Sequence, residues 1–110
     1  MYRINVYIPS THLEIVKSAM FAVGAGRIGT YDQCCWQVEG QGQFRPLEGN
    51  QAFLGETNQL EVVCEYKVEM VCEGPFVKAA IKAMLASHPY EEVAYDVSLA
   101  VDPLTLAPGG

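Results

Sequence analysis

The segment 88–96, which reads His-Pro-Tyr-Glu-Glu-Val-Ala-Tyr-Asp, holds the highest density of chemically active groups in this 110-residue chain. Imidazole and carboxylate groups together suit zinc, cobalt, nickel and copper ions. We therefore predict a divalent metal ion as the one cofactor, held by His88 together with Glu91 or Glu92. The alternative is that His88 caps a helix C-terminus, where a donor or positive group is favoured, while the tyrosines pack and the glutamates face water.

Catalysis by these groups alone is not supported by their spacing. Glu91 and Glu92 are adjacent, so on a strand they would point to opposite faces and could not work as an acid–base pair. Cys34 would be a nucleophile only with a base beside it, and His88 is the one candidate base. No feature of the sequence spacing supports a contact between these two residues. We assign no catalytic residue, and we expect His12 to be a surface residue.

Composition predicts one compact, acidic domain. Hydrophobic residues make up 50% of the chain, charged residues 18%, and the formal net charge is -6. This charge argues against a nucleic-acid partner, and no apolar run reaches the roughly 20 residues that span a bilayer. The first residues read as a strand and not as a signal peptide. The four cysteines form no Cys-x-x-Cys pair, which excludes a zinc ribbon and favours reduced thiols in a cytoplasmic protein.

Periodicity in the first part of the chain predicts a strand followed by a helix. Apolar residues alternate with polar ones over residues 2–8, and a helix is expected over residues 11–23, with Thr11 and Glu14 as a capping box. The glycines at positions 24, 26 and 29 match the Gly-x-Gly-x-x-Gly string of dinucleotide-binding folds. That string requires a strand before it and a helix after it, and here the order is reversed. The glycines therefore predict a helix C-cap and a turn.

The remaining elements follow from the same patterns. We expect a second strand over residues 31–39, an irregular stretch over residues 40–59 with a short hairpin near its start, and a long strand over residues 60–72. The apolar even positions of the long strand place Cys64 and Cys72 on the core side. A second helix should run from Pro75 to residue 88, and a last strand over residues 93–99.

This order of elements predicts an α+β, ferredoxin-like βαββαβ domain, with an antiparallel four-stranded sheet and both helices on one face. We expect one domain over residues 1–101 and a loose tail over residues 102–110. The other sheet face is left open, which favours association with a second copy or with a protein partner.

Two motifs carry a family resemblance that extends from Tyr2 to about Leu99. The glycine-rich segments 24–31 and 40–55, together with Cys34 and the segment 88–96, resemble the PII/CutA-like domain inserted in bacterial Nif-three-like (YqfO-type) dinuclear-metal-centre hexameric proteins. In that family the metal ligands lie in two flanking halves that this chain lacks. The chain resembles a free-standing insert, and no dinuclear site is transferred to it. Ala52 stands where the inserted copies are expected to have proline.

The resemblance implies trimers that bind small ligands or metal ions at clefts between subunits. We therefore predict a small oligomeric binding or regulatory module, with a metal-assisted hydrolase and a structural protein-interaction domain as alternatives. Its cleft is expected to involve the glycine turn, the long loop and the segment 88–96, with these ligand-binding residues: Gly24, Gly26, Gly29, Tyr31, Phe44, Pro46, Tyr90 and Tyr95.

Overall fold

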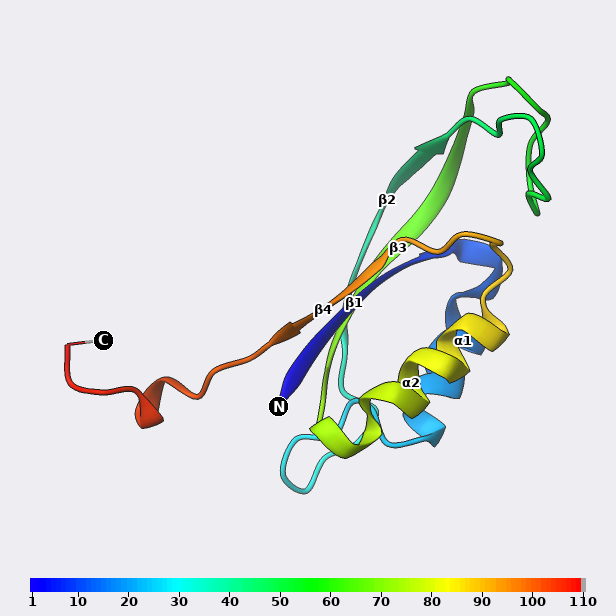
Figure 1. Cartoon of the computed structure of the whole chain (residues 1–110). Helices are drawn as coiled ribbons and strands as arrows, with labels where there is room; N and C mark the ends of the chain where they lie inside the picture. Colours follow the sequence, from blue (N-terminus) through cyan, green and yellow to red (C-terminus); the bar gives the residue numbers. More distant parts are fainter. Residues whose placement is uncertain (110) are drawn as a thin grey trace.

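A computed structural model describes residues 1–109 as a four-stranded antiparallel sheet with two helices on one face (Figure 1). The strand order is β2-β3-β1-β4. This arrangement confirms the predicted ferredoxin-like fold. The helices and strands are β1 (Tyr2–Pro9), a 3₁₀ turn (Ser10–His12), α1 (Leu13–Ala22), β2 (Trp36–Phe44), β3 (Glu61–Cys72), α2 (Gly74–Ser87), β4 (Tyr95–Leu99) and a second 3₁₀ turn (Pro103–Thr105).

The core lies between the helices and the centre of the sheet. Alternate residues of β1 and of the second half of β3 point toward α1 and α2, as the period-two pattern predicts. Each helix contributes the apolar stripe that the sequence indicates. The buried apolar residues are Ile4, Val6, Ile8, Leu13, Val16, Met20, Ala25, Val68, Met70, Cys72, Ala80 and Met84.

The predicted capping box at the start of α1 is wrong. A 3₁₀ turn occupies residues 10–12, the helix begins at Leu13, and no side chain caps its first turn. The Thr11 hydroxyl instead lies 2.8 Å from Nδ1 of His12. The hydroxyl is therefore paired with the neighbouring imidazole and does not accept a hydrogen bond from a backbone N–H, as a capping residue would. In α2, by contrast, Pro75 lies in the first turn, as predicted.

The second strand begins later than its pattern suggested. Residues 31–39 were expected to form it, but β2 begins at Trp36, and the short hairpin predicted near Gly40 is wrong because these residues continue β2 to Phe44. Glutamine and glycine give this half of β2 no apolar alternation. Its backbone is instead held by pairing with β3, in a register that ends at Phe44 opposite Glu61.

The first half of β3 lies beyond the cover of the helices (Figure 1). Val68 is fully buried, whereas Val62, on the same face of the same strand, is 55% exposed. The prediction that Cys64 is buried in the core is therefore wrong, because no helix covers this part of the strand. Its thiol donates a hydrogen bond to the Glu39 carboxylate at 3.3 Å, and this bond raises the pKa of the thiol. A raised pKa keeps Cys64 a protonated, poor nucleophile.

The C-terminal residues 101–109 are exposed and lead away from the sheet (Figure 1). The domain boundary at residue 101 stays a prediction. Over residues 1–109, neither helix is long and apolar enough to cross a membrane.

Candidate functional site

The predicted ligand-binding residues lie at two opposite ends of the domain (Figure 1). The glycine turn sits beside the end of β3, where the Gly26 amide donates to the Val71 carbonyl at 2.8 Å. Phe44 and Tyr90 lie at the other end, where the rings are 6.1 Å apart. Within one chain these two groups do not form a common cleft.

The glycine turn ends α1 in a Schellman motif. Gly24 has φ +112°, its amide donates to the Phe21 carbonyl, and the next amide, of Ala25, donates to Met20. Gly26 has φ +78°, and a Cβ there would lie 2.8 Å from the Phe21 ring. The structure thus confirms the predicted helix C-cap and turn.

The other members of this group have no shared cavity. Gly29 (φ +57°) has open space around it, and Tyr31 is 73% exposed, its backbone paired with Ile28. Cys34 also belongs to this end, because its amide donates to Gly26. Gly26 is bonded to Val71, which lies opposite Arg3 of β1, whereas His88 is bonded to Tyr7. Arg3 and Tyr7 are four residues apart on the strand, which separates them by about 13 Å. Cys34 and His88 therefore do not form a nucleophile–base pair.

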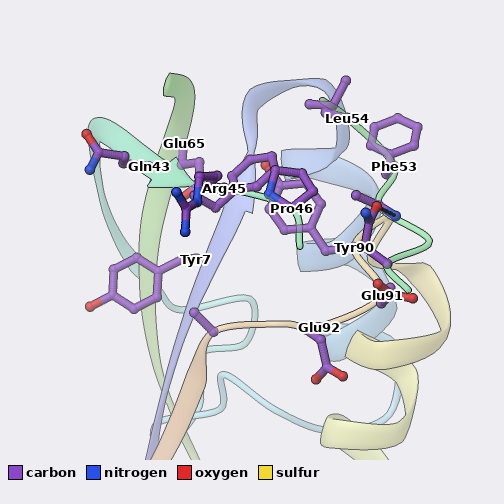
Figure 2. Close-up of a pocket in the computed structure, with 14 residues that line it drawn as sticks. Tyr7, Gln43, Arg45, Pro46, Phe53, Leu54, Glu65, Tyr90, Glu91 and Glu92 are labelled. Carbon is purple, nitrogen blue, oxygen red and sulfur yellow. Dashed lines mark hydrogen bonds between the residues drawn. The ribbon is translucent and has the colours of Figure 1, made fainter. Parts of the chain in front are cut away.

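At the opposite end, three segments that are distant in sequence enclose a cavity of about 320 Å³ (Figure 2). One segment is the end of β2 with the loop that follows it. The second is the open face of β1 and β3, and the third is the turn that follows α2. The lining residues are Tyr7, Gln43, Phe44, Arg45, Pro46, Asn50, Ala52, Phe53, Leu54, Glu65, Tyr90, Glu91, Glu92 and Ala94.

The loop contacts both the turn after α2 and the first 3₁₀ turn, and these contacts hold the cavity together. The Gln51 amide donates to the Glu91 carboxylate at 2.9 Å, and the Phe53 ring meets His12 edge-on at 5.5 Å. The loop is irregular, as predicted, but its apolar residues pack only in part: Pro46 is buried, whereas Leu47 and Phe53 are 57% and 48% exposed. Asn50 fixes its turn by donating to the Leu47 carbonyl.

His88 is buried and positions the turn after α2. Its Nε2 lies 2.8 Å from the Tyr7 carbonyl oxygen, and its Nδ1 accepts from the Tyr90 amide at 3.2 Å. An amide donor at Nδ1 requires the neutral ring with its proton on Nε2, which then donates to Tyr7. Burial lowers the pKa of His88 and favours this neutral form. The imidazole thus joins β1 to the turn that carries Tyr90 into the cavity.

The predicted metal ligands reach the cavity only in part. Glu91 and Glu92 are exposed at its rim, whereas both ring nitrogens of His88 are engaged with backbone groups. Among residues 1–109, no three His, Cys, Asp or Glu side chains are grouped so that they could hold a metal ion. Metal binding by His88 stays a prediction, and it would require one of its two hydrogen bonds to break.

The hydroxyl of Tyr90 is buried and lies near the Glu65 carboxylate, although no well-formed hydrogen bond joins it to an atom of residues 1–109. Burial, and then the nearby Glu65 carboxylate, raise the pKa of this phenol. Tyr90 was predicted as a ligand-binding residue and lies in the cavity with Phe44 and Pro46. Tyr95, predicted with them, pairs with Val6 in β4 and is not among the lining residues.

Sequence reasoning missed several lining residues, above all Tyr7, Arg45 and Glu65. Tyr7 and Glu65 occupy the polar positions of alternating strands, which the pattern marks as solvent-facing. The loop that covers them could not be placed from its own sequence. The signal that was available is the adjacent pair of large apolar residues in the loop, Phe53 and Leu54, which both line the cavity.

Comparison with known proteins connects the fold and the motifs to one group of proteins. The chain is 46% identical over 95 residues to a Bacillus subtilis protein named GTP cyclohydrolase 1 type 2 homolog, and 42% identical over 98 residues to a Mycobacterium leprae protein of the same name. It also superposes on a Bacillus cereus protein related to NIF3 with a TM-score of 0.74 and 43% identity over 87% of the chain. The predicted resemblance to the PII/CutA-like domain of Nif-three-like proteins is confirmed.

These matches cover most of this chain but only about a quarter of each relative, so the functions of the whole relatives are not assigned to it. They cover 86% and 89% of this chain but only 26% of either curated relative, and 24% of the Bacillus cereus protein. CutA from Archaeoglobus fulgidus matches over 96% of this chain and 89% of its own, with a TM-score of 0.64 and 14% identity, a likeness of fold alone. No family model matches the chain.

Proposed function

We propose that this chain is a small binding module that takes a ligand in the cavity between the loop after β2 and the turn after α2, and that it works as a homo-oligomer. The observation that carries the ligand part is the cavity itself, of about 320 Å³, which three separate segments of the chain build around the Phe44 and Tyr90 rings. Pockets of this size, with apolar walls and a few polar groups, are typical of small-molecule sites.

An enzymatic role has less support. Catalysis by a nucleophile needs a base within hydrogen-bond reach, and Cys34 lies at the far end of the domain from His88. The neutral His88 is engaged on both sides by backbone groups. A metal-assisted hydrolase would need further metal ligands beside Glu91 and Glu92, and residues 1–109 contain no group of three such side chains. No observation favours this function.

The oligomeric part is supported by the uncovered face of the sheet. Trp36 and Val38 of the edge strand β2 lie on the face away from the helices and are 59% and 44% exposed. Apolar groups of this kind on an open sheet favour a subunit interface. The resemblance to PII and CutA domains implies a trimer, and a different protein partner on the same face is the alternative.

Native mass spectrometry of freshly purified protein tests both parts at once. We expect a closed oligomer with one small molecule retained per chain. The variant Phe44→Ala should lose this molecule and keep its subunit number, whereas Tyr31→Ala, an exposed aromatic at the other end, should retain both. A bare monomer would contradict the oligomeric part. An oligomer that stays bare after incubation with a metabolite extract would contradict the ligand part.

A further inference from the structure

The cavity is lined by more acidic than basic side chains. We propose that it takes an organic cation, a protonated amine or a quaternary ammonium attached to an apolar body. This inference rests on the proposed function and names its ligand class. The lining contains three carboxylates, of Glu65, Glu91 and Glu92, against the single guanidinium of Arg45.

The carboxylates are not neutralised by protein cations. Within residues 1–109, the ion pairs are those of Lys17 with Glu14 and of Lys67 with Glu69, and neither includes a residue of the cavity. Glu91 uses one oxygen to accept from the Gln51 amide and keeps the other free. A carboxylate beside a partly enclosed apolar space attracts a cation more strongly than one in open water, because the screening is weaker there.

The absence of a side chain at Gly42 leaves room for the Glu65 carboxylate. Gly42, in the neighbouring strand β2, has no Cβ, and one added there would collide with the Glu65 carboxylate. Glu65 therefore occupies the space that any other residue at position 42 would fill. Glu65 is half-buried and lines the cavity, and Gly42, a residue type that is poor for strands, accommodates it.

The aromatic residues around Glu65 suit the same ligand class. Tyr7, Phe44 and Tyr90 line one cavity, with Phe44 and Tyr90 tilted by 54° to each other (Figure 2). A cation over the faces of such rings is attracted by their quadrupoles.

An anionic ligand such as a nucleotide fits this cavity less well. Phosphate sites in proteins use helix N-termini, glycine-rich backbone nests or clusters of basic residues. The lining offers only Arg45, which is exposed, and a phosphate there would face three carboxylates. The glycine turn, which could have formed a nest, lies at the other end of the domain.

Calorimetric titration with a matched pair of probes tests this inference. Phenethylammonium and its neutral analogue 2-phenylethanol share an apolar body, and GTP serves as the anionic comparison. We expect the ammonium to bind about tenfold tighter than the alcohol at low salt, and added salt to weaken that preference. Glu65→Gln should abolish the preference, whereas Glu48→Gln, in the loop between β2 and β3 but outside the cavity, should keep it.

Each result decides one point. Equal binding of ammonium and alcohol, both lost in Phe44→Ala, would overturn the inference about charge and leave the binding function intact. Tighter binding of GTP would also overturn it. The failure of all three probes to bind would overturn the charge inference, and the proposed function would then depend on the native mass spectrum. Should Glu65→Gln not fold, Glu92→Gln, at an exposed rim position, must lower the preference severalfold for the inference to stand.

Discussion

The two halves of β3 have the same apolar alternation and different surroundings. In the second half, Val68 and Met70 are buried under the helices, whereas in the first half Val62 and Cys64 are exposed. The half that the helices cover holds the fold together. The uncovered half forms, with β2 and its loop, the region that contains the cavity. Apolar alternation alone therefore identifies a strand face, and only the length of the helical layer decides whether that face is core.

The largest expected effect comes from the same substitution made in both halves. Val68→Ala should lower the free energy of unfolding by about 2 kcal/mol, because it removes two buried methyl groups and leaves a cavity. Val62→Ala should change it by less than about 0.5 kcal/mol, as is usual for an exposed site. Urea unfolding followed by circular dichroism measures both. Equal losses would show that the outer half of β3 is also core.

Glycine substitutions should separate a structural turn from open space. Gly26→Ala should cost about 2 kcal/mol, because the residue has φ +78° and its Cβ would press on Phe21 and on the Cys34 carbonyl. Gly29→Ala has φ +57° but nothing within 4 Å, so its cost should be about 1 kcal/mol. Urea unfolding of the two variants tests this, and a larger cost at Gly29 would contradict the described turn.

A pH dependence should arise from His88. Burial lowers its pKa and His12 acts in the same direction, while the bond to Tyr7 and the charge of Glu65 oppose them. The unfolded chain therefore takes up the proton more readily. His88 contributes its full stability above its ordinary pKa of about 6.5, and that contribution is lost as the pH falls through the lower pKa of the folded state.

The variant His88→Gln isolates this contribution. Near neutral pH its free energy of unfolding should be about 1 kcal/mol below that of the wild type, because the hydrogen bonds of His88 are lost. This difference in free energy should become smaller toward about pH 5. Urea unfolding at several pH values measures the difference. A difference that stays constant over this range would show that His88 has the same pKa in the folded and the unfolded chain.

The smallest effect concerns the loop. Glu91→Ala removes the acceptor of the Gln51 amide and should lower stability by only about 0.5 kcal/mol, since the amide can turn to water. The loop should nevertheless be cut faster by a protease in brief digestion, because one of its attachments is gone. Glu92→Ala is the matched control, as no hydrogen bond joins its side chain to another described residue. Equal cutting of the two variants would contradict the role of Glu91.

The sequence predicted the fold well because its signals are local and regular. Residues 2–8 and 60–72 alternate cleanly, and the two helices have apolar stripes bounded by glycine or proline. The site was predicted in part. Phe44, Pro46 and Tyr90 were found through motifs, whereas Glu65 was missed because its place at the cavity depends on Gly42 in another strand and on a loop that covers it. The glycine turn was assigned to the cleft although its geometry serves α1.

Titration of phenethylammonium into isotope-labelled protein, followed by proton–nitrogen correlation spectra, locates the binding site within the fold. The peak shifts should be confined to the cavity, at the amides of Gln51, Tyr90 and Ala94, with those of Gly26 and Gly29 unchanged. Shifts centred on the glycine turn, or none in the cavity at saturating probe, would contradict the claim that the uncovered half of the domain binds the ligand.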